Sequence, residues 1–194
     1  MANVDLKKIT RRNFLEYWWI APVLGAGGFF AWFGIRSYRI LAGKTAPAKP
    51  NFQTGNKFKI ARVSDLQKSG DAKPFEYPVQ IGSSTQTLPA ILIRVSKPQP
   101  GGLSQGNTHL IALSRICTHQ NCPCDFIVKP EIASMAYKYR PPAGNPILGC
   151  ACHFSAFDPE KAGESVSGPA LKPLPRLQLE LRSGDVFAVG LEKS

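Results

Sequence analysis

The spacing of apolar residues changes once along the chain, near residue 41. From Tyr17 to Ile35 there is no charged residue. This run of 19 residues, at about 1.5 Å per residue, approaches the ~30 Å thickness of a bilayer's hydrocarbon core. Aromatic residues stand near both ends, at 17–19 and at Trp32 and Tyr38, as is typical of membrane interfaces. The pattern predicts one N-terminal transmembrane helix, the anchor, over residues 17–41.

After the anchor, the pattern is that of short strands. Apolar or alternating runs occupy residues 57–63, 90–95, 109–114, 176–182 and 186–191, and turn residues separate them. Residues 177–181 alternate strictly, and Ser183-Gly184-Asp185 then turns the chain into the next run, which predicts a hairpin. No long amphipathic helix follows residue 41. We expect residues 57–194 to form an all-β sandwich or small barrel whose long loops carry the chemistry.

The segments around the anchor predict where the head lies. Residues 42–56 are rich in Pro, Ala and Gly, which indicates a flexible linker. In the N-terminal segment 1–16, Thr10-Arg11-Arg12-Asn13-Phe14-Leu15 resembles a twin-arginine export signal. We therefore expect a cytoplasmic N-terminus, a single pass through the cell membrane, and a soluble head on the periplasmic or extracytoplasmic side.

Net charge excludes one class of function. The chain carries a formal charge of +11, but residues 1–56 hold eight Lys or Arg against two acids. In the head, no basic cluster is interleaved with aromatic residues, as a nucleic-acid binder requires. The excess charge flanks the predicted anchor, where it can meet membrane lipid. We expect no nucleic-acid partner.

All five cysteines and two of the three histidines fall in two short segments. The first box reads Cys117-Thr118-His119-Gln120-Asn121-Cys122-Pro123-Cys124, and the second box reads Cys150-Ala151-Cys152-His153-Phe154-Ser155-Ala156-Phe157-Asp158. Each box follows a strand-like run, so both can occupy loops at one end of a sheet. Together the loops can hold a binuclear metal site between them. Two other interpretations are a structural zinc site, which leaves the second cysteine pair unexplained, and a disulfide scaffold, which leaves the histidines unexplained.

These two boxes closely resemble the signature boxes of the Rieske iron–sulphur family. The resemblance implies an antiparallel β-sandwich head with a cluster-binding loop region and one 2Fe–2S cluster. It implies that Cys117 and Cys150 bind one iron, that His119 and His153 bind the other, and that Cys122 and Cys152 form a disulfide. Gly168-Pro169-Ala170, followed by Pro173-Leu174-Pro175, resembles the family's proline loop, which covers the cluster.

The ligand set determines the expected redox behaviour. Two neutral imidazoles in place of two thiolates remove two negative charges, which raises the reduction potential. The resemblance implies that Ser155 donates a hydrogen bond to a bridging sulphide. Two residues further, many relatives have a tyrosine that donates to a ligand sulphur, but here the residue is Phe157. One missing donor indicates a mid-range potential.

Two parent complexes fit the resemblance. A single anchor, a linker and a β head resemble the Rieske subunit of a quinol-oxidising cytochrome bc-type complex, with cytochrome b-type and c-type partners and quinol as substrate. Such a subunit is part of a quinol–cytochrome c oxidoreductase and is not catalytic alone. Alternatively, Phe75-Glu76-Tyr77-Pro78, the second box and Glu160-Lys161-Ala162-Gly163 resemble the small subunit of an arsenite-oxidase-type enzyme, which relays electrons from a molybdenum subunit. The anchor and linker favour the first interpretation. A Rieske dioxygenase fits less well, because no mononuclear-iron domain follows.

Three features have no counterpart in this pattern. Cys124 makes the cysteine count odd, and we expect a buried free thiol. His109 lies in a strand-like run, where a surface or core histidine is more common than a ligand. The 27 residues between Cys122 and Cys150 form an insertion that is either a partner-docking segment, through Lys138–Pro142, or a functionless surface loop.

Overall fold

The computed structural model describes residues 17–42 and 49–193. The chain divides into two compact units, residues 1–43 and 44–194, and each is described by itself. The twin-arginine-like motif and the rest of the expected N-terminal segment 1–16 lie outside the described residues, as does 43–48 of the expected linker.

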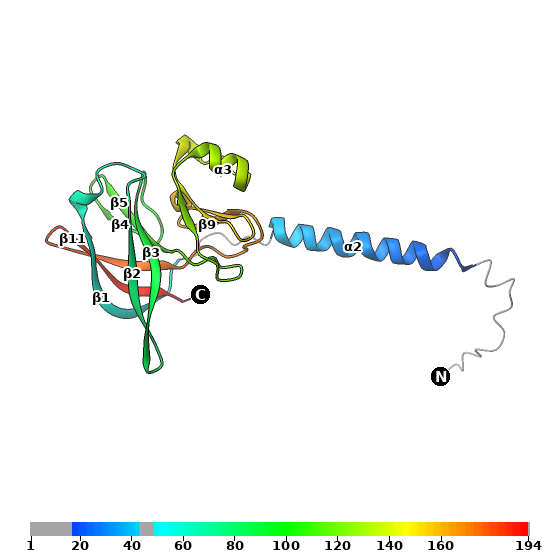
Figure 1. Cartoon of the computed structure of the whole chain (residues 1–194), viewed down its shortest axis with the longest axis horizontal. Coiled ribbons are helices and arrows are strands. Elements are labelled where there is room, and N and C mark those ends of the chain that lie inside the picture. The colour runs from blue at the N-terminus through cyan, green and yellow to red at the C-terminus, as the bar shows by residue number, and fades with distance from the viewer. Residues whose placement is uncertain (1–16, 43–48, 194) are drawn as a thin grey trace. The chain divides into compact units, whose positions relative to one another are not determined.

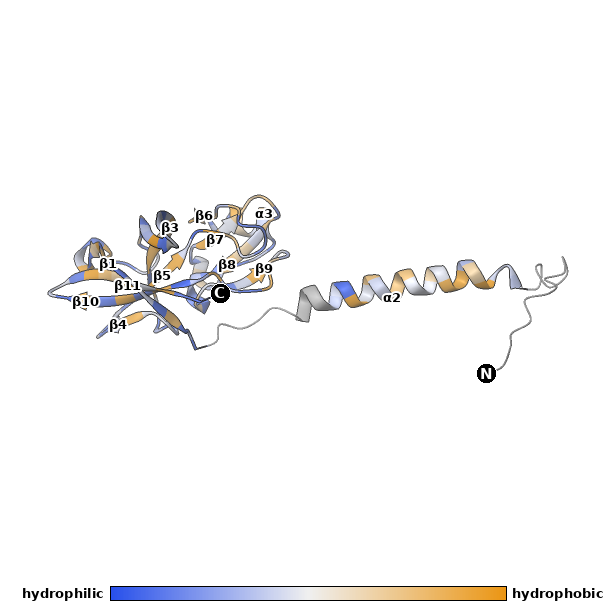
Figure 2. Cartoon of the chain, turned by 90° about the horizontal axis from the view of Figure 1, so that it is seen from below, coloured by the Kyte–Doolittle hydropathy of each residue, from blue (hydrophilic) through white to orange (hydrophobic). Residues whose placement is uncertain are grey.

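The first unit contains helix α2, Ile20–Ala42. It covers most of the predicted anchor. However, none of the helices within 17–42 and 49–193 is long and apolar enough to cross a membrane. The predicted helix over 17–41 is therefore present in α2, but the described residues do not support its prediction as a transmembrane span. Four glycines, Pro22 and Arg36 interrupt the apolar residues of α2, and Figure 2 shows the resulting mixture of hydropathies along the helix.

The second unit, the head, is mostly β, as predicted. Its larger sheet has seven strands, in the order β1-β11-β10-β5-β3-β2, with β4 paired to β5, and the smaller sheet has the order β6-β7-β8-β9. All strand pairs are antiparallel. The strands of the larger sheet are β1 (Phe52–Arg62), β2 (Ala72–Ile81), β3 (Ser84–Val95), β4 (Leu103–Gln105), β5 (Thr108–Ser114), β10 (Arg176–Arg182) and β11 (Asp185–Glu192). Those of the smaller sheet are β6 (Asp125–Ile127), β7 (Ile147–Cys150), β8 (Ser155–Asp158) and β9 (Glu164–Ser167).

Short helices complete the head. Helix α3 spans Pro130–Tyr137, and three 3₁₀ turns span Val63–Asp65, Pro142–Gly144 and Pro159–Lys161. Figures 1 and 2 both draw α3 and the smaller sheet at one end of the head, with β1 and β11 at the other end.

The continuous apolar runs in β3 and β5 follow from burial on both faces. Alternate residues of a strand point to opposite sides of a sheet. Ile91 and Ile93 therefore join one core, which also holds Cys117, Cys150 and Phe157 and is named the site core here. Ala90 and Leu92 join a second core on the other face, between β3, β5, β10 and β11. A strand buried on both faces carries few polar residues.

The predicted hairpin at 177–189 is confirmed. Strands β10 and β11 pair, with Arg182 opposite Asp185. Ser183 and Gly184 both have positive φ, +50° and +83°. This is the combination that a two-residue hairpin turn requires.

Other elements were not predicted from the sequence. Strand β2 carries Pro74 and Pro78 and forms the end of the larger sheet, where proline removes no hydrogen bond from a neighbouring ladder. Strand β1 begins at Phe52, inside the expected linker. Its first residues are ordered because Phe52 and Gln53 pair with Glu192 and Leu191.

A buried ion pair closes the open end of the β10–β11 hairpin. Arg176, only 1% exposed in its side chain, forms a bidentate pair with Glu192, with Nη2–Oε1 at 2.5 Å and Nε–Oε2 at 2.8 Å. Its other guanidinium nitrogen donates to the carbonyl of Pro100 at 3.1 Å. The arginine thus joins β10, β11 and the segment before β4.

We predict that Glu192→Ala lowers the free energy of unfolding of the head by about 3–5 kcal/mol, because it leaves the Arg176 guanidinium buried without its carboxylate. The measurement is the urea midpoint of the full chain, followed by circular dichroism. Glu180→Ala is the control, because Glu180 pairs with Lys57 and Arg182 at the surface and its loss should leave the midpoint unchanged. Equal midpoints for both variants would contradict a stabilising role for the buried pair.

Candidate metal centre

The first box forms a tight loop between β5 and β6. The amide of Cys117 donates to the carbonyl of Cys122 at 2.8 Å, and the amide of Asn121 donates to the carbonyl of Cys117 at 3.0 Å. Asn121 takes a left-handed conformation, φ +56°, which asparagine tolerates better than most residues. Backbone hydrogen bonds therefore stabilise this turn. The side chains of Cys117 and His119 are not needed to close the loop.

The second box is the turn of the β7–β8 hairpin. Cys150 ends β7 and pairs with Ser155, the first residue of β8. Phe154 has φ +56° and completes the return of the chain. Cys152 and His153 lie in this turn and are exposed, whereas Cys150 is buried.

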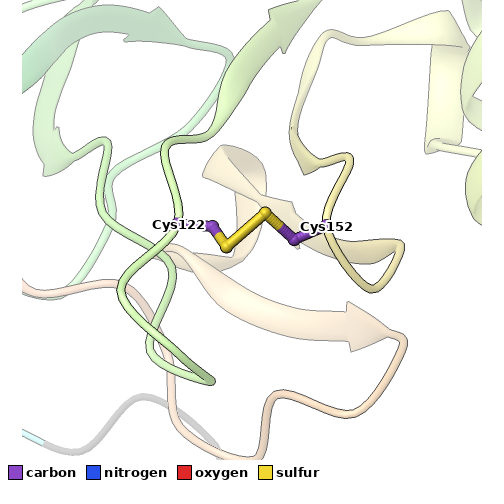
Figure 3. The surroundings of a disulfide bond; sticks show 2 residues. All are labelled: Cys122 and Cys152. Carbon is purple, nitrogen blue, oxygen red and sulfur yellow. A yellow bond between two sulfur atoms is a disulfide. The ribbon is translucent and has the colours of Figure 1, made fainter.

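The structure joins the two loops through Cys122 and Cys152, as Figure 3 shows. Their Cα atoms are 6.6 Å apart, within the range of ordinary disulfides, and 30 positions separate them in the sequence. This crosslink is the pairing that the family resemblance implies. It limits separation of the loops that carry the candidate ligands.

The structure gathers the candidate ligands into two groups, one of thiols and one of imidazoles. The sulphur atoms of Cys117, Cys124 and Cys150 all lie within 4.8 Å of one another, and the three thiols are buried. The imidazole rings of His119 and His153 are in edge-to-face contact, with centroids 4.8 Å apart. Each group thus contains side chains from both boxes.

The donor set fits an iron–sulphur centre. Nδ1 of His119 is buried and has no hydrogen-bond partner, which costs free energy unless another group uses its lone pair. Burial is the main cause that raises the pKa of the Cys117 thiol, and a bound cation would counter it by favouring the thiolate. A buried nitrogen without a partner and a cluster of buried thiols are both features of a metal ligand set.

Cys124 was expected to be a buried free thiol, and the structure places it so. Its surroundings were not expected. It belongs to the site core, and its sulphur lies beside those of Cys117 and Cys150. Burial, followed by the charges of these two thiols, raises the pKa of Cys124 strongly. The odd cysteine count was the only sequence signal for this third sulphur.

The proline loop is fixed to both boxes. Gly168 has φ +79°, and a Cβ there would lie 2.5 Å from Cα of Ser155 and 2.6 Å from the carbonyl oxygen of Phe154. The hydroxyl of Thr118, in the first box, donates to the carbonyl of Lys172 at 2.8 Å. Only glycine allows this close approach, so the motif Gly168-Pro169 places the loop directly against the second box.

Ser155 and Phe157 both lie near the cysteines, since Ser155 pairs with Cys150 across the hairpin. Both are completely buried, and Phe157 packs in the site core with Cys117 and Cys150. The Ser155 hydroxyl accepts a hydrogen bond from the amide of Ala170 at 3.1 Å. This bond orients the oxygen and leaves its own proton available for donation.

The insertion packs against the second box, which the sequence did not predict. The ring of Tyr137, at the end of α3, covers Gly149, where a Cβ would lie 2.7 Å from the Tyr137 hydroxyl. The same ring lies 6.1 Å, between centroids, from that of Phe154. The missing side chain at Gly149 therefore makes room for an aromatic ring directly before Cys150.

A second tyrosine attaches the segment that follows α3. The hydroxyl of Tyr139 donates to the buried carboxylate of Asp158 at 2.6 Å. Burial, and then this hydrogen bond, raises the pKa of Tyr139, so the hydroxyl remains a donor. Asp158 also accepts from the amide of Glu160 at 2.9 Å. Tyr137 and Tyr139 share a third small core with Ala133, Ile147 and Ala156.

Comparison with known proteins identifies the family. The Rieske [2Fe-2S] domain matches residues 56–178. Iodate reductase subunit IdrB of Denitromonas iodatirespirans is 29% identical over 134 residues, 69% of this chain and 62% of the relative. The same subunit of Pseudomonas sp. strain SCT is 28% identical, over 69% of this chain and 59% of the relative. The chain therefore spans about three fifths of the length of these two relatives.

Two solved structures overlap this chain with TM-scores below 0.5. The soluble domain of Rieske protein II (soxF) from Sulfolobus acidocaldarius has a TM-score of 0.47 and 26% identity, covering 70% of this chain and 78% of that one. The plasma membrane Rieske protein PetC3 from Synechocystis PCC 6803 has a TM-score of 0.38 and 17% identity, covering 70% and 98%. With the family match extending over both boxes, this chain belongs to the Rieske [2Fe-2S] family of electron-transfer proteins and its cofactor is a 2Fe–2S cluster.

Proposed function

We propose that this chain is the Rieske subunit of an arsenite-oxidase-type enzyme, in which it relays electrons between a separate molybdenum-containing subunit and a redox carrier. The observation that carries the proposal is the similarity to two iodate reductase subunits over 134 residues. Iodate and arsenite are both oxyanions. A catalytic partner that oxidises or reduces an oxyanion accounts for this similarity and for the motifs that resemble the small subunit of arsenite oxidase.

From the sequence, the cytochrome bc-type complex was the favoured interpretation and the arsenite-oxidase-type enzyme the alternative. This proposal reverses that order. The quinol–cytochrome bc interpretation depended on the predicted transmembrane anchor and linker. No helix within residues 17–42 and 49–193 is long and apolar enough to cross a membrane, and strand β1 takes up residues 52–56 of the linker. Electron transfer from quinol to a c-type cytochrome therefore becomes the second candidate.

For the ligands, we propose that Cys117 and Cys150 bind one iron and that His119 and His153 bind the other. The supports are the 4.8 Å clustering of the thiols, the adjacent imidazoles and the unpartnered Nδ1 of His119. The cluster supplies a site that accepts and releases one electron. His153 is exposed and His119 is partly buried, so the histidine side of the centre faces the surface, where a redox partner can approach.

We also propose that the head works outside the cytoplasm. A structural disulfide such as Cys122–Cys152 persists in an oxidising compartment and is rare in the cytosol. The twin-arginine-like motif at residues 10–15 is consistent with this location, because that route exports proteins already folded around a cofactor.

The ligand assignment is testable one residue at a time. Alanine at Cys117, His119, Cys150 or His153 should abolish the paramagnetic signal of the reduced Rieske cluster, because each removes one bond to iron. The measurement is electron paramagnetic resonance of the purified full chain. His109→Ala is the matched control, since His109 lies on β5 and its Nδ1 contacts the hydroxyl of Ser104 at 3.1 Å. A normal signal from any of the four variants removes that residue from the ligand set.

Because Phe157 stands where many relatives have tyrosine, we predict a reduction potential below the top of the Rieske range. A hydrogen bond to a charged group contributes about 1.5–3 kcal/mol, and about 59 mV corresponds to a tenfold change for a one-electron couple. The missing tyrosine hydroxyl thus lowers the potential by tens of millivolts, up to about 130 mV. In a redox titration, Phe157→Tyr should raise the potential and Ser155→Ala should lower it. A high wild-type potential that Phe157→Tyr does not change would mean that other donors to the sulphurs determine it.

The metal content of the parent complex distinguishes the arsenite-oxidase-type enzyme from the quinol-oxidising complex. We expect the tagged full chain, purified from its own cells, to bring with it a larger subunit that contains molybdenum, measured by mass spectrometry of protein and metal. Co-purification with a subunit that contains b-type haem, without molybdenum, would instead establish the quinol-oxidising complex. Cys117→Ala is a useful control, because loss of the cluster ligand should remove electron transfer through the complex but not the larger subunit's own metal.

A further inference from the structure

The outer face of α3 is apolar and exposed. Ile132 and Met135 are 44% and 83% exposed, and a spacing of three residues places them on the same side of the helix. Val128, just before the helix, is 58% exposed. Tyr137 is buried on the opposite, inner face against Gly149. The helix thus has one face packed against the second box and one face without a neighbour in the described part of the chain.

A groove lies beside this apolar face. It has a volume of about 590 Å³ and is lined by α3 and the segment that follows it, through Pro130, Glu131, Ser134, Met135, Arg140, Pro141, Ala143 and Gly144. Arg140 is exposed, and its guanidinium makes no ion pair with any residue in 17–42 or 49–193. A cation that is not paired within its own chain can pair with a carboxylate of a partner at little cost in broken contacts.

The groove has a rigid connection to the metal centre. Tyr137 contacts Gly149 and Phe154, which directly precede Cys150 and follow His153. Tyr139 is hydrogen-bonded to Asp158, at the end of the second box. A protein held in the groove would therefore be held at a constant position relative to the ligand loop. Constant position matters for electron transfer, because its rate falls steeply with distance.

We propose that the groove between α3 and Arg140 is the docking site for the catalytic subunit, and that it accepts an apolar side chain beside Met135 and an acidic side chain against Arg140. The inference rests on the proposed function, because it names the partner of the same electron relay. Residues 128–145 carry three cations, Lys129, Lys138 and Arg140, against the single carboxylate of Glu131. Charge complementarity therefore favours an acidic partner surface with an apolar centre.

A lipid surface fits the groove less well. The hollow of about 590 Å³ calls for a protruding side chain, whereas a bilayer surface offers no such shape. A protein partner with a matching protrusion satisfies this shape.

The test measures the dissociation constant between the full-length, cluster-containing chain and the larger subunit with which it co-purifies. Met135→Asp should weaken binding at least about tenfold, because it puts a charge in the apolar part of the contact. Arg140→Glu should weaken it by a similar factor, and more strongly at low salt, where the lost attraction is least screened. Neither variant should change the paramagnetic signal or the reduction potential, since both side chains are exposed.

Gln86→Asp is the matched control. It adds the same charge to an exposed position of β3, in the β2–β3 hairpin whose turn points away from α3 in Figure 1, and it should leave the dissociation constant unchanged. If a larger subunit co-purifies but binds Met135→Asp and Arg140→Glu as tightly as wild type, the docking site is wrong and the proposed function stands. If no larger subunit co-purifies, both fail. Binding of the chain to phosphatidylglycerol vesicles that Arg140→Glu abolishes, with unchanged subunit affinity, would assign the groove to lipid instead.

Discussion

Two loops whose disulfide cysteines are 30 residues apart in the sequence have to meet at one point. The rest of the head stabilises this arrangement. The Cys122–Cys152 disulfide joins the loops covalently, and the proline loop contacts both of them through Gly168 and the Thr118–Lys172 hydrogen bond. The site core lies beneath them, where Ile91 and Ile93 of β3 pack with Cys117 and Cys150. A buried thiol cluster and an imidazole nitrogen without a hydrogen-bond partner are costly in an ordinary protein, and here they are explained by the cofactor that the loops bind.

The insertion between the boxes changes how the second loop is supported. Tyr137 occupies the space that Gly149 leaves open, and Tyr139 binds the buried Asp158. These contacts give the second box a small core of its own. They also hold an exposed apolar helix face at a constant position beside the metal centre, together with Arg140, which forms no ion pair within the described residues. This is the physical basis for the proposal that the insertion is a docking element.

The redox chemistry and the identity of the parent complex depend on different parts of the molecule. The ligand set and the surroundings of Ser155 and Phe157 determine how strongly the cluster holds an electron. They do not determine where the electron comes from. The similarity to iodate reductase subunits and the surface of the insertion bear on that second question, and the proposed relay beside a catalytic subunit rests on these two observations.

The sequence by itself determined the ligand boxes, the family, the all-β class of the head and the β10–β11 hairpin. Each of these follows from the spacing of residues that are close together in the chain. Cys–x–His, Cys–x–x–His and strict alternation at 177–181 are patterns of a few residues. It did not determine the position of Cys124, the ring of Tyr137 on Gly149 or the Arg176–Glu192 pair, since these contacts join residues far apart in the chain. The lack of charge between Tyr17 and Ile35 also predicted a transmembrane helix, whereas no helix among the described residues is long and apolar enough to cross a membrane. Tertiary structure decided the three contacts, since a long-range contact depends on which segments become neighbours in the folded head, and no short segment carries that information.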